Sequence, residues 1–335
     1  MATQRILVTG GAGYIGSHTV RELQRQGYDV VVFDNLVKGH AQAVENAPLI
    51  VGDLLNPEEI QAVFRRYPDI AGVIHFAAYV EVGESMENPD KYFRNNIQGS
   101  VNLIEAMLDA GVSYLVFSST CAVYGTPERV PVTEEESYKP ESVYGASKRM
   151  AEQVMEWYDR TKGLRFIPLR YFNASGASFD ARIGDAYKPA SRLIPRLMEY
   201  ILGQRDDFMV FGDDYPTPDG TAIRDYIHVD DLATAHIAAL KYLWNGGESM
   251  AFNLGTGKGS SVMEIIDMVR EVTGRDFEVR VGPRRPGDAV RIWADNTRAR
   301  AVLGWEPRYG LREIIETDWR WHSTHPCGFE PCSET

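Results

Sequence analysis

The stretch RILVTGGAGYIGSH, residues 5–18, decides the fold, because a short apolar strand runs through a glycine-rich turn into a helix. Gly11, Gly13 and Gly16 fit the spacing G-x-G-x-x-G, and Gly10, Gly13 and Gly16 fit G-x-x-G-x-x-G. Glycines so spaced give a tight turn, a close approach of the backbone to a pyrophosphate, and close packing of helix on strand. The start of the helix also offers free N–H groups to phosphates. The stretch therefore predicts a dinucleotide-binding unit.

The second expected strand, DVVVFD at 29–34, indicates which dinucleotide binds. It ends at Asp34, 18 residues after Gly16. An acidic residue about 20 residues beyond the glycine turn hydrogen-bonds the ribose hydroxyls of the cofactor. Since a carboxylate repels a 2′-phosphate, the sequence predicts NAD rather than NADP.

The first half of the chain alternates short β-branched runs with longer helical patterns. Several strands are apolar at nearly every position, as in VVVF (30–33), which is typical of strands buried on both faces of a parallel sheet. This rhythm predicts an α/β fold with a doubly wound parallel (Rossmann) sheet. Strands are expected at 5–10, 29–34, 48–53, 72–78, 114–119 and 165–172, and helices at about 14–26, 57–66, 89–110 and 144–162.

After Asn173 the rhythm breaks, because Gly, Pro, Asp and Ser accumulate between short helical patterns. We expect a smaller mixed α/β substrate domain there, with helices near 192–202, 229–244, 261–273 and 311–322. The expected division is an NAD-binding domain over 1–173 plus about 226–256, and a substrate domain over 174–225 and 257–335.

Composition limits the possible partners and compartments. The chain has 335 residues and a net charge of −12, which disfavours nucleic acid as a partner. No apolar run approaches the ~20 residues of a membrane span. Three cysteines are an odd, low number that favours a reducing, cytoplasmic compartment. The tail CGFEPC, 327–332, matches no common zinc spacing, so we expect no metal and a loose polar tail.

The segment VYGASK places Tyr144 and Lys148 four residues apart, on one face of an expected helix. A phenol with a pKa of ~10 is a poor base at neutral pH. A nearby ammonium and an oxidised nicotinamide ring would stabilise the phenolate and lower that pKa. Tyr158 and Lys162 repeat the spacing about 21 Å further along the helix, where we expect a solvated face.

Hydroxyl groups gather at the end of the expected strand 114–119. Ser118, Ser119 and Thr120 end that strand, and doubly wound sheets bind ligands at the carboxyl ends of their strands. Such hydroxyls are often only caps of the strand end. Together with Tyr144 and Lys148, they predict an active site.

These motifs together resemble the extended short-chain dehydrogenase/reductase family. The residues that carry the resemblance are the glycine turn, Asp34, HFAA (75–78), NN (95–96), SST…VYG (118–125), Tyr144-x3-Lys148 and LRYFN (169–173). The segments VGES (82–85), IRDYIHVDDLA (223–233), FNLGTG (252–257), PRRPGD (283–288) and WAD (293–295) are similar to those of members acting on UDP-sugars. The likeness spans nearly the whole chain.

The resemblance implies reversible epimerisation at carbon 4 of UDP-galactose and UDP-glucose, through a 4-keto intermediate and with tightly bound NAD. Tyr144 would take the proton of the 4-hydroxyl while a hydride passes to the nicotinamide. Lys148 would hold the cofactor ribose, and Thr120 would hydrogen-bond the reacting oxygen where many members carry Ser. The resemblance also suggests a homodimer.

The resemblance further assigns binding residues position by position. Cofactor-binding positions are Gly10, Gly13, Tyr14, Ile15, Gly16, Asp34, Asn35, Asp53, Leu54, Phe76, Ala77, Ala78, Asn95, Tyr144, Lys148 and Phe172. Substrate-binding positions are Thr120, Tyr144, Asn173, Arg192, Leu193, Phe211, Arg224, Arg285, Asp288 and Ile292. Arg280, Arg284 and Arg291 lie close to Arg285 in the sequence, so we expect a local basic cluster for the UDP-sugar despite the negative net charge.

Three positions depart from the family pattern. Val80 stands where a cofactor-contacting Lys is often found, and Arg192 replaces an Asn beside the nucleotide. Ile292 falls where an aromatic residue restricts the sugar pocket in some members, so UDP-N-acetylhexosamine or UDP-pentose substrates stay open.

Two other functions remain as alternatives. Nucleotide-sugar dehydratases and decarboxylases use acidic residues just after the strand-end hydroxyl, where this chain has Cys121 and Ala122. A non-catalytic NAD-binding sensor could dispense with Tyr144 and Lys148, which this chain keeps.

Overall fold

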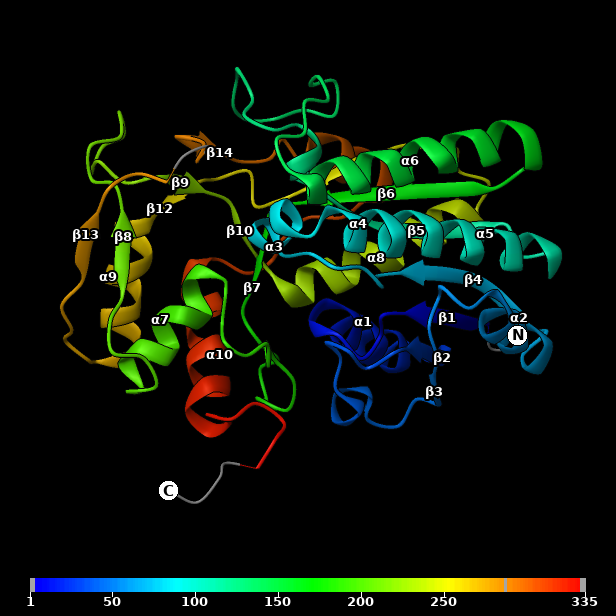
Figure 1. Ribbon diagram of the computed structural model, residues 1–335, viewed down its shortest axis with the longest axis horizontal. Coiled ribbons are helices and arrows are strands. Elements are labelled where there is room, and N and C mark those ends of the chain that lie inside the picture. Colours follow the sequence, from blue (N-terminus) through cyan, green and yellow to red (C-terminus); the bar gives the residue numbers. More distant parts are fainter. Residues whose placement is uncertain (1–3, 286–287, 332–335) are drawn as a thin grey trace.

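The computed structural model describes residues 4–285 and 288–331, and its larger part is built on one seven-stranded sheet. The strand order is β11-β6-β5-β4-β1-β2-β3, and every pairing is parallel (Figure 1). This confirms the predicted doubly wound fold. The strands are β1 (Arg5–Thr9), β2 (Asp29–Asp34), β3 (Leu49–Val51), β4 (Ile70–His75), β5 (Tyr114–Thr120), β6 (Arg165–Tyr171) and β11 (Phe252–Leu254).

Helices cover both faces of this sheet. On one face, α1 (Tyr14–Arg25) and α8 (Val229–Trp244) form a core with Ile6, Val8 and Val32. On the other face, α2 (Pro57–Arg66), α5 (Gly99–Asp109) and α6 (Val143–Lys162) pack on Leu7 and Val31. Because successive strand residues point to opposite faces and both faces are covered, strands such as β1 and β2 are apolar at consecutive positions in their middle.

The expected helix 89–110 is interrupted in its first half. It begins as α4 (Pro89–Tyr92), passes through a π-helical turn at Phe93–Gln98, and continues as α5. Such turns often occur at functional sites. Here the turn carries Asn95 and Asn96, and the Asn96 amide donates to the Tyr79 carbonyl at 3.0 Å. Sequence reasoning missed α3 (Val82–Glu87), which is only six residues long.

The smaller part contains three helices and several short strands, at the left of Figure 1. Its core lies among α7 (Leu193–Ile201), α9 (Val262–Thr273) and α10 (Leu311–Thr324). The strand groups are β8 (Met209–Phe211) with β13 (Arg280–Gly282), β9 (Ile223–Arg224) between β12 (Ser260–Ser261) and β14 (Arg291–Ile292), and β7 (Asn173–Ser175) with β10 (Tyr226–His228). Single turns are 3₁₀ at Ala41–Val44 and Cys121–Val123, and π-helical at Ala299–Leu303.

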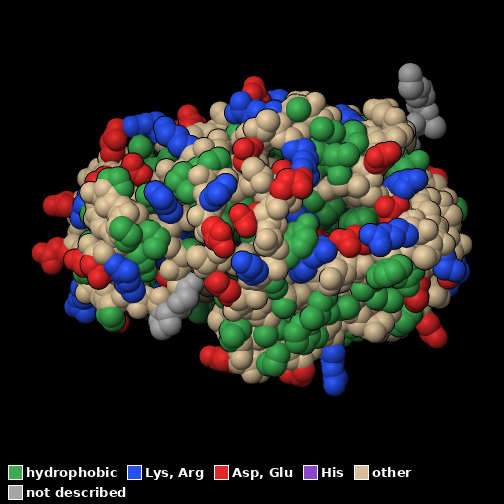
Figure 2. Space-filling view, turned by 90° about the horizontal axis from the view of Figure 1, so that it is seen from above, with side chains coloured by type: hydrophobic (Ala, Val, Ile, Leu, Met, Phe, Trp, Pro, Cys, Tyr) green, Lys and Arg blue, Asp and Glu red, His purple; other side chains and the backbone are tan. Residues whose placement is uncertain are grey.

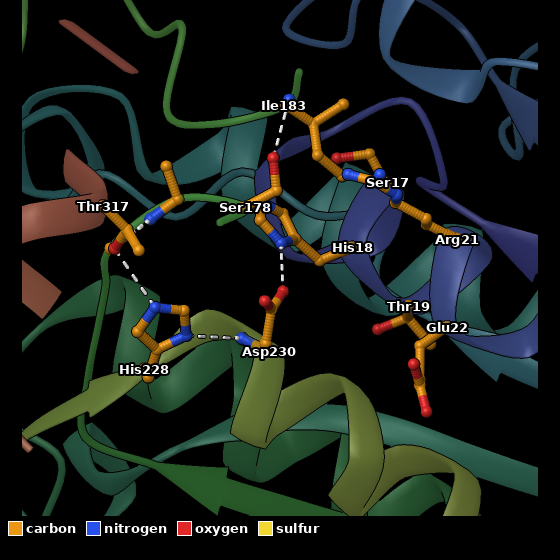
Figure 3. Close-up of polar contacts among 12 residues, drawn as sticks. Ser17, His18, Thr19, Arg21, Glu22, Ser178, Ile183, His228, Asp230 and Thr317 are labelled. Atoms are coloured by element: carbon orange, nitrogen blue, oxygen red, sulfur yellow. Dashed lines mark hydrogen bonds and ion pairs between the residues drawn. The ribbon is translucent and has the colours of Figure 1, made fainter. Parts of the chain in front are cut away.

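A buried polar junction joins the two parts (Figure 3). His18 Nδ1 of α1 lies 2.6 Å from the Asp230 carboxylate of α8, and His228 Nε2 lies 3.1 Å from Thr317 Oγ1 of α10. Burial lowers the pKa of His228 to about 4, so this ring is neutral at pH 7. The contacts run from α1 through Asp230 at the start of α8, whose N–H donates to His228 Nδ1 at 3.1 Å, and on to α10 of the smaller part.

None of the helices in the described ranges combines the length and hydropathy that crossing a bilayer requires.

Candidate functional site

Two adjoining cavities lie where the sheet strands end and the smaller part begins. The first, of about 610 Å³, is lined by ten of the predicted cofactor residues. They are Gly10, Gly13, Asp34, Asn35, Asp53, Leu54, Phe76, Ala77, Ala78 and Asn95, and of these Phe76 and Ala78 also line the second cavity. The second, of about 910 Å³, extends toward the smaller part. Gly10 and Gly13 line both cavities, so the two are continuous at the glycine turn.

The glycine turn has the close backbone contacts that its sequence predicts. Gly10 has φ +72°, and a Cβ there would lie 2.5 Å from the Ala77 nitrogen. A Cβ at Gly16 would lie 2.2 Å from the Gly10 carbonyl oxygen. Gly13 is the N-cap of α1, and no side chain caps the helix there. The first N–H groups of α1 thus face a concave, glycine-lined surface, which suits a pyrophosphate.

Asp34 lies at the end of β2 and is 7% exposed. Its carboxylate accepts hydrogen bonds from Ala12 N at 3.0 Å and Leu36 N at 2.9 Å. Burial raises the pKa of Asp34, and these two hydrogen bonds oppose the rise. The carboxylate therefore braces the glycine turn and also borders the first cavity, as a ribose-binding acid would.

The second cavity reaches Ser118, two residues before Thr120 on β5, whereas Thr120, Tyr144 and Lys148 are not among the residues that line it. Tyr14, Ile15, Gly16 and Arg192 line it, as expected, together with Ser118 and Tyr171. The Ser118 and Tyr171 hydroxyls hydrogen-bond each other at the carboxyl ends of β5 and β6. Sequence reasoning missed Tyr171, although it lies in the quoted motif LRYFN.

Tyr144 and Thr120 meet at this end of β5. Burial, and after it the neighbouring Tyr171, raise the pKa of Tyr144. A hydrogen bond with Thr120 opposes this rise but does not cancel it, so the net shift is upward. The predicted lowering of this pKa involves bound NAD as well as the Lys148 ammonium, and it stays a prediction. Thr120 Oγ1 also accepts from Ala122 N at 3.1 Å, so the strand-end cap is present as well.

Lys148 lies on the same face of α6 as Tyr144, and its side chain is hydrogen-bonded to the backbone of β5. Its side chain is buried, and Nζ donates to the Ser118 carbonyl at 2.9 Å. Burial lowers the pKa of Lys148 to about 7, while the Glu152 carboxylate raises it. By contrast, Tyr158 of the repeated pair hydrogen-bonds Glu105 at the surface, and Lys162 is exposed.

The predicted nucleotide-binding residues gather on β8, β9 and β14. Arg224 and Asp288 form an ion pair of 3.6 Å, and the Arg285 guanidinium lies 3.8 Å from the centre of the Phe211 ring. Ile292 pairs with Arg224 in register. Phe172 shares a core cluster with Ile292, Asn173 lies on β7, and Leu193 begins α7.

The expected basic cluster forms only in part. Arg280 is mostly exposed and lies 3.8 Å from Asp207, and Arg284 pairs with Asp214. Arg192 does reach the second cavity, where it pairs with Asp185 at 2.9 Å and lies over the Tyr14 ring at 5.0 Å. Val80 also borders this cavity and is 45% exposed.

The tail is not loose as far as Pro331. Phe329 packs on Trp321 with ring centres 5.1 Å apart and lines the second cavity. Cys332 of the predicted tail lies outside the described residues. Among the described residues, no group of three or more His, Cys, Asp or Glu side chains could hold a metal ion.

Sequence reasoning also missed Lys38 and Tyr187, because both residues lie in loops without periodicity. Lys38, which lines both cavities, donates to the hydroxyl of Tyr187, which lines the second, at 2.9 Å.

The chain is similar to known epimerases over nearly its full length. Residues 6–255 match the model of the NAD dependent epimerase/dehydratase family. A UDP-glucose 4-epimerase of Rhizobium meliloti is 48% identical over 323 residues, covering 96% of this chain and 98% of that protein. A crystal structure of UDP-glucose 4-epimerase from Brucella ovis in complex with NAD has 44% identity and a TM-score of 0.93, covering 95% of this chain and 98% of that one.

A second solved structure is a UDP-glucose-4-epimerase from Stenotrophomonas maltophila with bound NAD and formylated UDP-arabinopyranose. It is 40% identical with a TM-score of 0.94, and the match covers 96% of this chain and 99% of that chain.

Proposed function

Because the chain belongs to the NAD dependent epimerase/dehydratase family, we propose that it interconverts UDP-galactose and UDP-glucose by inverting carbon 4 with tightly bound NAD. The observation that carries this proposal is that Tyr144 and Thr120 meet at the end of β5, near Ser118, which lines a cavity continuous with the glycine turn.

The residues of both cavities fit NAD. The glycine turn and the start of α1 would hold the pyrophosphate through backbone N–H groups. Asp34 and Asn35 would hold the adenosine ribose, and Asp53 and Leu54 would border the adenine. When bound, NAD supplies the acceptor and then the donor for the hydrogen of carbon 4.

Tyr144 would act as the base that takes the proton of the sugar 4-hydroxyl and later returns it. Burial holds its phenol protonated, so the site needs additional positive charge before the proton leaves. Lys148 supplies one such charge in its ammonium form, and NAD⁺ carries another. Thr120 would donate to the reacting oxygen as its charge develops, since its hydroxyl already reaches Tyr144.

The UDP part of the substrate would bind on the smaller part. Arg224 and Arg285 would neutralise the diphosphate, and Phe211 offers an aromatic face. Asn173, Leu193 and Asp288 would complete this side. Arg192 would add a cation at the side of the second cavity nearest α1.

We assign the two binding functions to two parts of the chain. Cofactor binding falls to residues 1–173 plus about 226–256, and UDP-sugar binding to 174–225 and 257–335.

Ile292 leaves the choice of sugar to experiment. It is 8% exposed and aliphatic, so it would leave more room for the N-acetyl group of a UDP-N-acetylhexosamine than an aromatic residue at this position would. Incubation of the purified protein with UDP-galactose, UDP-N-acetylgalactosamine or UDP-arabinose, without added NAD, tests the proposal by NMR. We expect inversion of UDP-galactose to be fastest. If none of the three inverts even after NAD is added, the proposed function is wrong.

Dehydratase and sensor functions are less well supported. Burial raises the pKa of Cys121 to about 12, and Ala122 has no ionisable group, so neither residue could move a proton as an acidic residue does. A sensor would tolerate loss of the Tyr144 hydroxyl, whereas an epimerase would not.

We further propose that the protein is a cytoplasmic homodimer. Met150 and Trp157 of α6, seven residues apart and therefore on one helical face, are 43% and 62% exposed. Figure 2 shows hydrophobic side chains gathered along the lower edge of the face that carries α6. Light scattering should give twice the chain mass of 37.6 kDa, and Trp157→Arg should halve it. A single-chain mass for the wild type would contradict the dimer.

A further inference from the structure

A fully buried ion pair lies directly behind the reacting groups. Glu152 of α6 is 0% exposed and Arg170 of β6 is 2% exposed. The Arg170 guanidinium grips the carboxylate with two N–H groups, Nε at 3.0 Å and Nη2 at 2.7 Å. A buried ion pair usually stabilises a fold no more than an apolar pair of the same volume would, because both charges must be removed from water. Stability alone therefore gives little reason for this pair.

The carboxylate is joined to the catalytic end of β5. Ser119 Oγ donates to Glu152 Oε1 at 2.5 Å. Ser119 lies between Ser118, whose carbonyl accepts from Lys148 Nζ, and Thr120, which hydrogen-bonds Tyr144. Glu152 also follows Lys148 by four residues on the same face of α6. The single carboxylate thus fixes the segment to which Lys148 and Tyr144 are attached.

Among the described groups, Glu152 is also the carboxylate whose charge raises the pKa of Lys148, against the lowering caused by burial. His75 of β4 faces Lys148 but is neutral, because burial lowers its pKa to about 3. The Phe117 ring centre of β5 lies 4.7 Å from Lys148 Nζ. Arg149, the residue after Lys148 on α6, donates to Glu152 Oε2 at 3.1 Å and shares this oxygen with Arg170.

The same ion pair has a structural side. Arg170 donates to the Tyr124 hydroxyl and to the Tyr138 hydroxyl, each at 2.9 Å, and so anchors the loop between them. Loss of Glu152 would loosen this loop as well as the active site. A useful test must therefore separate stability from chemistry.

We propose that Glu152 is a positioning residue for the reaction: it keeps Lys148 in its ammonium form and holds the hydroxyl-bearing end of β5 in place. Arg170 offsets the cost of burying the Glu152 carboxylate by pairing with its charge. This proposal rests on the proposed epimerase function. Glu152 would act through Lys148 and Ser119 and would contact neither the sugar nor the cofactor.

The test compares the pH dependence of kcat in Glu152→Gln and Glu156→Gln holoenzymes. Glutamine keeps the shape and the ability to accept from Ser119 but removes the charge. Glu156 lies one turn further along α6 and pairs with Arg149 at 2.7 Å, but among the described residues it makes no hydrogen bond or ion pair with Ser119 or Arg170, so it is a matched control. Epimerisation of UDP-galactose is followed from pH 5.5 to 9.5, with bound NAD and Tm measured on the same samples.

Without the Glu152 charge, Lys148 loses its proton at lower pH. We expect the alkaline limb of kcat to move down by about one pH unit or more, with kcat about tenfold lower at pH 8 and KM and NAD content unchanged. Glu156→Gln should match the wild type. An alkaline limb that stays in place in Glu152→Gln, or moves equally in Glu156→Gln, would overturn the proposal, whatever happens to Tm.

Because Glu152→Gln leaves Arg170 without its counter-charge, a second variant guards against unfolding. Ser119→Ala removes only the hydroxyl that links the carboxylate to β5, and it should lower kcat severalfold at unchanged KM and NAD content. Unchanged kcat in Ser119→Ala would also overturn the proposal. An inactive wild type would overturn the epimerase function and this proposal together, whereas an active wild type with unaffected variants overturns this proposal alone.

Discussion

The glycine turn provides a pair of substitutions in which only one residue touches the proposed cofactor site. Gly10 and Gly27 both have left-handed backbone conformations, with φ +72° and +85°. Alanine pays a strain of about 1–2 kcal/mol at either position. The two sites differ in their surroundings, since a Cβ at Gly27 would have no atom within 4 Å. Gly27→Ala therefore measures the conformational cost alone.

At Gly10 the added methyl group meets backbone. Its Cβ would lie 2.5 Å from Ala77 N and 2.8 Å from Phe76 C, and ordinary contact begins at 3.4 Å, so Ala77 must move by about 0.9 Å. Phe76 N and Ala77 N both donate to the Thr9 carbonyl, at 2.8 and 3.1 Å, and resist that shift. Overpacking of this kind costs about 1–3 kcal/mol. With the strain, we expect a total of about 2–5 kcal/mol for Gly10→Ala.

The assay counts NAD released on heat denaturation per purified chain, alongside the free energy of unfolding in urea. Gly27→Ala should keep its NAD and lose about 1–2 kcal/mol. Gly10→Ala should lose most of its NAD, because Phe76 and Ala77 border the cavities. If Gly10→Ala purifies with as much NAD as Gly27→Ala, the assignment of these cavities to the cofactor is refuted.

Three further predictions concern single side chains. Tyr144→Phe keeps the ring packing and should lower epimerisation at least ~100-fold with NAD still bound, and activity within fivefold of wild type would contradict a role as base. Arg224→Gln should raise KM for UDP-galactose about tenfold or more without loss of NAD, and an unchanged KM would argue against diphosphate binding there. Burial lowers the pKa of His236 to about 4, below the ~6.5 of the unfolded chain, so its share of stability is complete above pH 6.5 and is lost as the pH falls toward 4. In His236→Gln the slope of unfolding free energy against pH between 5 and 6 should therefore be smaller by about 1.4 kcal/mol per pH unit, and an equal slope in urea titrations would contradict this.

The sheet and the glycine turn could be predicted because their signals are local. A strand that is apolar at consecutive positions, such as β2, indicates burial on both faces of a sheet. The glycine spacing around Gly13, between a strand and a helix, indicates a phosphate-binding turn. The pairing of Tyr144 with Lys148 likewise needs only the helical repeat. These features depend on neighbouring residues in the chain, which a sequence displays directly.

Other features depend on how distant segments meet. Tyr187, Asp185 and Phe329 reach the second cavity from loops and from the tail, where no periodicity indicates a direction. Arg280 and Arg284 are near Arg285 in sequence, yet their strand and loop aim them at surface aspartates. The rise that burial causes in the pKa of Tyr144 could not be predicted for the same reason, because burial is a property of the packed fold.

The most direct test of the epimerase assignment is NMR of UDP-galactose incubated with the purified protein in D₂O, without added NAD. The account predicts that UDP-glucose appears until equilibrium, and that carbon 4 keeps its protium because the hydrogen returns from the bound cofactor. Absence of UDP-glucose even after NAD is supplied, or deuterium at carbon 4 of the product, would contradict it.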